Sequence, residues 1–153
     1  MAKIRPAAER DIPRILDLYH ELTVTLPGEK DCGRPSLEAC EKVLAAIAAD
    51  PRHELLVVED GGEIAGTAVL LIVPNLSHAA TPWALVENLI VDQRFRRRGL
   101  ARMLLEYAVA RAREAGCHRI ELMSDNSRKD AHQLYRSVGF ADCATGFRNY
   151  FYQ

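Results

Sequence analysis

Arginines crowd the point where a predicted buried strand is followed by a long predicted helix. They occupy Arg94, Arg96, Arg97, Arg98 and Arg102. Backbone N–H groups at the start of a helix have no partner inside the helix and carry partial positive charge. Gly99 and the small Ala101 would let a ligand come close to that backbone. Because guanidinium groups pair well with phosphate, this stretch predicts a site for a phosphate-rich ligand.

Common nucleotide motifs do not account for this stretch. The chain has no Gly-x-x-x-x-Gly-Lys-Ser/Thr run, and no Gly-x-Gly-x-x-Gly near a first strand followed by an acidic residue. It does have Arg96-x-x-Gly99-x-Ala101, which resembles the Arg/Gln-x-x-Gly-x-Gly/Ala signature of GNAT acetyltransferases. In that family the turn holds the pyrophosphate of coenzyme A.

Two flanking segments extend this resemblance. Residues 86–92 (VENLIVD) are similar to the family's fourth strand, and Asn126 followed by residues 131–140 (AHQLYRSVGF) is similar to its closing motif. Many members have proline where this chain has Asp92, and that proline only fixes the turn. The resemblance covers residues 83–140 closely and is topological before them.

The resemblance implies acetyl-CoA as cosubstrate and no metal. Backbone groups of Leu89, Ile90 and Val91 would then pair with the pantetheine arm, although a plain core strand explains these side chains equally well. Asn126 would contact the arm or the adenosine end. The pyrophosphate would be held by Arg96, Arg97, Arg98, Gly99, Leu100, Ala101 and Arg102.

Two residues are candidates for proton transfer. Glu87 is the sole charge inside an otherwise apolar strand, and a buried carboxylate is costly unless it is paired or used, so we expect a general base. The alternative is a structural pair with an arginine. Tyr135 matches the family's usual proton donor to the departing thiolate, with helix packing beside Leu134 and Val138 as its alternative. Cys117, with no obvious activating base, is a weaker candidate for a covalent route.

The hydrophobic pattern predicts the elements that would position these residues. Strands are expected at residues 3–7, 54–59, 63–73, 83–92, 119–124, 140–143 and 147–152. Helices are expected after Asp11 and Ser36, from Leu100 to Ala115 with Gly116 as the stop, and at 130–138. This order agrees with the GNAT acyltransferase fold, an α/β (α+β) architecture. It has a twisted, mixed, mostly antiparallel sheet of six to seven strands flanked by four helices, with strands splayed at the acetyl-CoA site. We expect residues 1–153 to form one such domain.

Composition narrows the class further. The 153 residues carry a net charge of −1, which argues against a surface built to hold nucleic acid or an anionic membrane. No run approaches the ~18 apolar residues of a membrane span. The four cysteines form no Cys-x-x-Cys pair, so we expect reduced, buried thiols in a cytoplasmic protein.

The acceptor is expected to be a primary amine of a small molecule, such as an aminosugar, a polyamine or an amino-acid-like compound. A protein lysine or N-terminus stays open, as does a non-catalytic acyl-CoA-binding module. The arginine cluster could also belong to a nucleic-acid-binding domain, but this alternative is disfavoured because the net charge is near neutral and the basic residues form only one compact cluster. In this family the loop at about residues 23–36 and the last hairpin usually wall the acceptor pocket. Glu29, Asp31 and Glu38 could attract a cationic amine, but we expect them to be solvated surface charges. The aromatic residues Phe147, Tyr150, Phe151 and Tyr152 are expected to pack the sheet, with lining of the pocket as the alternative. A homodimer is compatible with the sequence.

Overall fold

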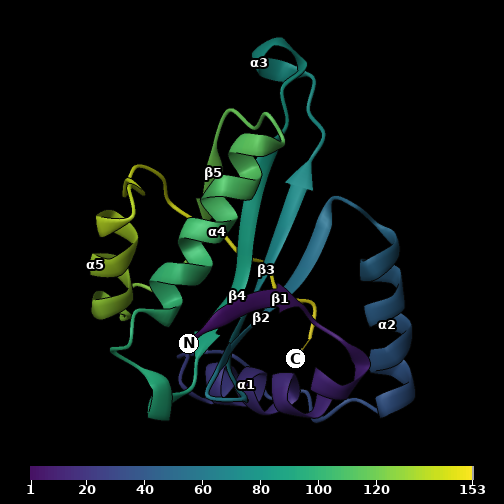
Figure 1. Cartoon of the computed structure of the whole chain (residues 1–153). Helices are drawn as coiled ribbons and strands as arrows, with labels where there is room; N and C mark the ends of the chain where they lie inside the picture. The colour runs from purple at the N-terminus through teal and green to yellow at the C-terminus, as the bar shows by residue number, and fades with distance from the viewer. Residues whose placement is uncertain (153) are drawn as a thin grey trace.

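A five-stranded mixed sheet forms the centre of the computed structural model, which describes residues 1–152 (Figure 1). The strands are β1 (Lys3–Pro6), β2 (His53–Asp60), β3 (Glu63–Val73), β4 (Trp83–Val91) and β5 (Ile120–Leu122). They lie in this same order across the sheet. Neighbours are antiparallel except β4 and β5, which are parallel because α4 connects them.

Helices follow the predicted order. They are α1 (Ile12–Val24), α2 (Leu37–Ala49), the short α3 (Ser77–Ala80), α4 (Leu100–Glu114) and α5 (Lys129–Ser137), with 3-10 turns η1 (Glu9–Asp11) and η2 (Gln93–Phe95). Ser36 caps α2 as expected, since its hydroxyl accepts from the Ala39 amide. Asp11 precedes α1 but its carboxylate does not cap that helix. It pairs with Arg5 and accepts from the Ala8 amide instead.

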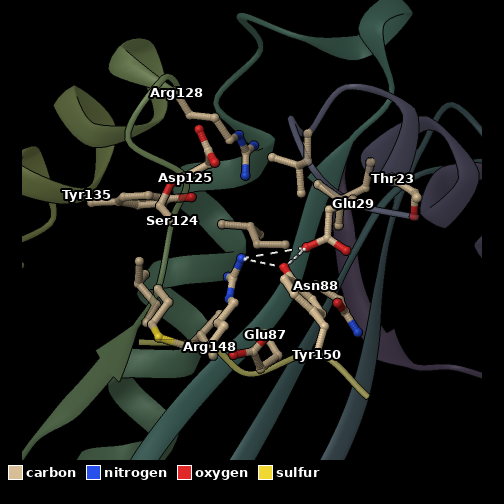
Figure 2. A pocket seen from close by; sticks show the side chains of 16 residues that line it. Thr23, Glu29, Glu87, Asn88, Ser124, Asp125, Arg128, Tyr135, Arg148 and Tyr150 are labelled. Carbon is tan, nitrogen blue, oxygen red and sulfur yellow. Dashed lines mark hydrogen bonds and ion pairs between the residues drawn. The ribbon is translucent and has the colours of Figure 1, made fainter. Parts of the chain in front are cut away.

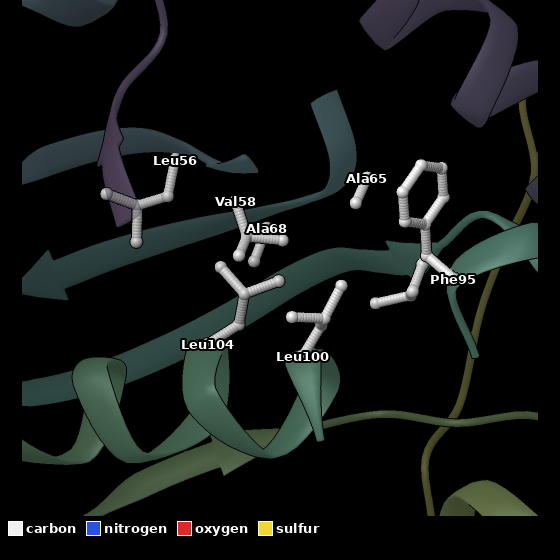
Figure 3. Close-up of a cluster of buried hydrophobic side chains, with 8 residues drawn as sticks. Leu56, Val58, Ala65, Ala68, Phe95, Leu100 and Leu104 are labelled. Atoms are coloured by element: carbon white, nitrogen blue, oxygen red, sulfur yellow. The ribbon is translucent and has the colours of Figure 1, made fainter. Parts of the chain in front are cut away.

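Both faces of the sheet are covered. Leu56, Val57 and Val58 are all fully buried, although successive side chains of a strand point to opposite faces. On one face, Leu100 and Leu104 of α4 pack against β2 and β3 (Figure 3). This packing fixes the start of α4, and with it the arginine loop, against the end of β4.

The sheet has fewer strands than the six to seven expected. The predicted strands at 140–143 and 147–152 do not form, and residues 141–152 are exposed coil. Phe147 and Phe151 are 90% and 94% exposed, so the expectation that they pack the sheet is wrong. The side chains of this segment contact Glu29 in the loop after α1, and its backbone forms no hydrogen-bonded ladder with β5.

Smaller differences concern α3 and the thiols. The expected loop at 74–82 contains the additional short helix α3, with His78, Ala79 and Ala80 at positive φ. Cys32 and Cys143 are exposed, against the expectation of buried thiols, and all four cysteines are free. Within residues 1–152, no helix is both long enough and apolar enough to cross a membrane.

Candidate active site

The arginine loop is shaped to present backbone amides at the start of α4. Gly99, the residue before the helix, has φ 78°, and Arg97 has φ 62°, so both lie in the left-handed region. No side chain caps α4. Within residues 1–152, the amides of Arg97 to Arg102 donate to no acceptor outside the helix. Such a row of free amides at a helix start is a natural site for a phosphate group.

The arginine side chains of the loop have partners of their own. Arg96 donates to the Val91 carbonyl at 3.2 Å and to Glu21 at 2.8 Å, Arg98 pairs with Asp60 at 3.1 Å, and Arg102 donates to the Ser137 hydroxyl at 2.6 Å. These guanidinium groups are about half exposed. Exposed ion pairs contribute only about 0–1 kcal/mol each, so a phosphate can compete for these side chains. Leu100 is buried in the core and can contribute only its backbone.

The pairing of β4 changes in the middle of the strand. Thr67 of β3 pairs with Ile90 and Val69 pairs with Glu87, so β4 carries an extra residue between them. Asn88, at φ 51°, lies in this bulge. Beside it, a Cβ on Gly66 would lie 2.7 Å from the Ile90 carbonyl oxygen, so only glycine lets β3 come this close.

On its other side, β4 separates from β5. The parallel ladder runs from Ala84 with Ile120 to Val86 with Leu122 and then ends. Beyond this point, Glu87 to Leu89 on one strand and Met123 to Asp125 on the other line a cavity of about 250 Å³. The free edge of β4 therefore faces open space next to the arginine loop.

Glu87 lines this cavity from the bulge, as Figure 2 shows. It is half-buried, and burial raises the pKa of its carboxyl above the ordinary value, with the nearby Arg148 acting in the opposite direction. No hydrogen bond or ion pair joins Glu87 to another of the described side chains. A carboxylate with a raised pKa that faces a cavity is suited to accept a proton.

Tyr135 reaches the same cavity from α5 (Figure 2). Its ring is buried and packs edge-on against Phe140, with centroids 6.4 Å apart. Tyr135 therefore packs in the core, and it also lines the cavity, as a proton donor would have to.

Of the other predicted site residues, one lines the cavity and the rest lie outside it. Leu89 lines it, whereas Ile90 and Val91 are buried in the core and pair with β3. Asn126 is exposed in the turn after β5 and is not among the lining residues. Cys117 is no candidate nucleophile, because burial raises the pKa of its thiol and so disfavours the thiolate.

Three lining residues, Glu29, Arg148 and Tyr150, form a cluster that the non-lining Tyr152 completes. Tyr150 donates to Glu29 at 2.6 Å, Tyr152 donates to the other oxygen of Glu29 at 3.1 Å, and Arg148 lies 3.6 Å from Glu29. Glu29 had been expected to be a solvated surface charge, but it lines the cavity and is only 22% exposed. Of the two roles considered for Tyr150, the structure shows lining of the cavity, whereas the sequence does not single out Arg148.

Comparison with known proteins decides the family. The family model described as "Acetyltransferase (GNAT) family" matches residues 15–140. The chain belongs to the GNAT acetyltransferases. It is thus an acetyltransferase, and enzymes of this fold use acetyl-CoA.

Individual relatives agree with this assignment. Glucosamine 6-phosphate N-acetyltransferase 1 of Oryza sativa subsp. japonica is 29% identical over 92% of this chain and 81% of its own. The aminoalkylphosphonate N-acetyltransferase of Salmonella typhimurium is 28% identical over 92% and 85%. The solved glucosamine-6-phosphate N-acetyltransferase of Arabidopsis thaliana has the same fold, with a TM-score of 0.85, 21% identity and 99% of each chain covered.

Proposed function

We propose that this acetyltransferase moves the acetyl group of acetyl-CoA to the primary amine of a small molecule, by direct attack while both are bound. The observation that carries the proposal is the cavity at the divergence of β4 and β5, lined by both Glu87 and Tyr135. A volume of about 250 Å³ suits a small acceptor better than a protein segment. Relatives named for glucosamine 6-phosphate and aminoalkylphosphonate support the same class.

The residues present fit acetyl-CoA. The amides and guanidinium groups from Arg96 to Arg102 would hold its pyrophosphate, and the free backbone edge of β4 at Leu89 would bind the pantetheine arm. Asn126, at the exposed turn after β5, would contact the cofactor outside the cavity. When bound, the cofactor supplies an activated acetyl group on a thiol leaving group.

Glu87 would act as general base. An alkyl amine with a pKa of about 10.4 is protonated at pH 7, so exposing its lone pair costs about 4–5 kcal/mol. A carboxylate that is partly withdrawn from water and has no partner among the described side chains can accept this proton, directly or through water. Glu87 is held by pairing with Val69 of β3, directly before the bulge at Asn88, and lines the cavity from this position.

Tyr135 would donate a proton to the departing thiolate. Its contribution would rest on the position of its hydroxyl in the cavity. The buried ring, held by Phe140, provides a fixed position.

A panel of amines incubated with acetyl-CoA, followed by release of free thiol, tests this proposal. We expect turnover with at least one small primary amine and its loss in the Glu87→Gln, Tyr135→Phe double variant. Binding of acetyl-CoA in calorimetry without turnover of any amine, peptide N-terminus or lysine would instead identify a non-catalytic acyl-CoA-binding module. Turnover of peptides alone would move the acceptor to proteins.

A further inference from the structure

Arg148 brings a positive charge into the acceptor side of the cavity. It belongs to the coil after α5 and lines the cavity together with Glu29 and Glu87 (Figure 2). Its side chain is 40% exposed. The segment is extended, so Arg148, Tyr150 and Tyr152 face Glu29 while Phe147 and Phe151 face solvent.

The guanidinium of Arg148 is only partly used within the protein. Its Nη1 donates to the Tyr150 hydroxyl at 3.3 Å and lies 3.6 Å from Glu29 Oε1. Its Nε and Nη2 donate to no other group among residues 1–152. A guanidinium has five N–H donors in a fixed plane, and the Nε–Nη2 edge is the edge that binds carboxylate or phosphate with two parallel hydrogen bonds.

Glu29 does not depend on Arg148 for its partners. Tyr150 donates to one of its oxygens at 2.6 Å and Tyr152 to the other at 3.1 Å, both closer than Arg148. The tyrosine hydroxyls thus hold the carboxylate, while Tyr150 also accepts from Arg148 and holds the guanidinium in place. Arg148 is thus positioned by its neighbours and lines the cavity, and its Nε–Nη2 edge has no partner among residues 1–152, so it is arranged to bind an anion.

From this geometry we infer that the acceptor carries an oxyanion, which Arg148 binds while the amine faces Glu87. The inference rests on the function proposed above and narrows its substrate class. The acceptor is a small primary amine with a carboxylate, phosphonate or phosphate group a few bonds from the nitrogen. Glu87 and Arg148 line the same cavity of about 250 Å³, so one small molecule in it contacts both. Polyamines have no oxyanion for Arg148 and are expected to be poorer acceptors.

Matched acceptors test the inference. Butylamine, 4-aminobutyrate and 3-aminopropylphosphonate differ only at the end remote from the amine, which is a methyl, a carboxylate or a phosphonate group. In addition, the best acceptor of the amine panel is compared with an analogue that differs from it only by the presence or absence of an oxyanion. We expect the wild-type enzyme to have a higher kcat/KM for the oxyanionic member of each pair. The carboxylate and phosphonate arms show which oxyanion is preferred.

Variants assign the preference to Arg148. Arg148→Gln should raise KM for the oxyanionic acceptor about 10- to 100-fold and remove the preference, since two charge-assisted hydrogen bonds are lost. Arg148→Lys keeps the charge but not the planar fork, and should restore only part of the preference. Arg136→Gln is the matched control, because Arg136 is an exposed arginine on α5 paired with Asp142 outside the cavity. It should leave the preference unchanged.

Binding measurements keep the test independent of turnover. Calorimetric titration of propylphosphonate, which has no amine, should show binding to the wild type and inhibition competitive with the acceptor. Equal kcat/KM for neutral and oxyanionic acceptors in the wild type, or an unchanged preference in a folded Arg148→Gln protein, would overturn the inference while the proposed function stands. No acetylation of any amine, with propylphosphonate still bound through Arg148, would instead refute the proposed function.

Discussion

Replacing Asp92 with asparagine should destabilise the junction between β4 and the arginine loop in a pH-dependent way. Asp92 directly follows β4 and is only 7% exposed. Its carboxylate pairs with Arg14 of α1 and accepts from the Arg94 amide at 2.7 Å and from the Arg94 guanidinium at 3.1 Å. Asn keeps the shape and one acceptor but loses the charge that both arginines face.

The pKa of Asp92 gives the size of the effect. Burial alone would raise it, but hydrogen bonds from Arg94 and Arg14 outweigh burial and lower the pKa from 3.8 to about 2. At about 1.4 kcal/mol per pKa unit, this corresponds to about 2 kcal/mol of folding free energy at neutral pH. Because the folded-state pKa lies below the unfolded one, this stability is present above the unfolded value near 3.8 and is lost as pH falls toward 2.

Urea unfolding at several pH values measures the effect. At pH 6–7 the Asp92→Asn protein should have a free energy of unfolding about 2 kcal/mol below the wild type, and the difference should shrink as pH falls from 4 toward 2. Asp142→Asn removes an exposed pair with Arg136 and should change stability by less than about 1 kcal/mol. A difference that stays constant with pH, or equal stability at pH 7, would refute the electrostatic role of Asp92.

Three further predictions concern catalysis and cofactor binding. Glu87→Gln should lower kcat about 10²- to 10³-fold at pH 7, and full activity of this variant would leave Glu87 only a structural role. The wild-type rate should fall as the pH is lowered through the pKa of Glu87, which lies above that of an ordinary glutamate because partial burial favours the neutral carboxyl. Tyr135→Phe should lower kcat about tenfold with the calorimetric Kd for acetyl-CoA nearly unchanged; an unaltered rate across pH would remove Tyr135 from the mechanism. Arg96→Ala should weaken acetyl-CoA binding about tenfold but not binding of a pantetheine fragment without phosphates, whereas equal losses would contradict a phosphate contact.

The arginine loop and its helix could be predicted from sequence because their determinants are local. Gly99 and Gly116, at either end of α4, both have positive φ as their positions require. The hydrophobic period of α4 predicts the side that packs on β2 and β3, and Leu100 and Leu104 are indeed buried there. Phosphate binding by this loop was expected from the same few residues, and the free amides found here support it.

The acceptor side could not be predicted in the same way, because its contacts are far apart in sequence. The Tyr150–Glu29 hydrogen bond joins residues separated by 121 positions. Residues 147–152 have the aromatic content of a strand, and that composition predicted a strand rather than an extended coil. Only the structure shows that Arg148, Tyr150 and Tyr152 contact Glu29 and that this segment does not pair with a neighbouring strand.

The whole candidate site depends on regular pairing ending in three places. The bulge at Asn88 interrupts β3–β4 pairing directly after Glu87, the end of β4–β5 pairing after Val86 frees the edge of β4, and the unpaired coil after α5 carries Arg148. The sequence predicted residues 83–92 as one continuous strand, since composition alone does not reveal an extra residue in a ladder. If β4 paired without a bulge, the residues after Asn88 would each shift to the opposite face, because side chains alternate. The backbone that leads from the cavity into the arginine loop would then have another register, so the candidate site depends on this break in pairing.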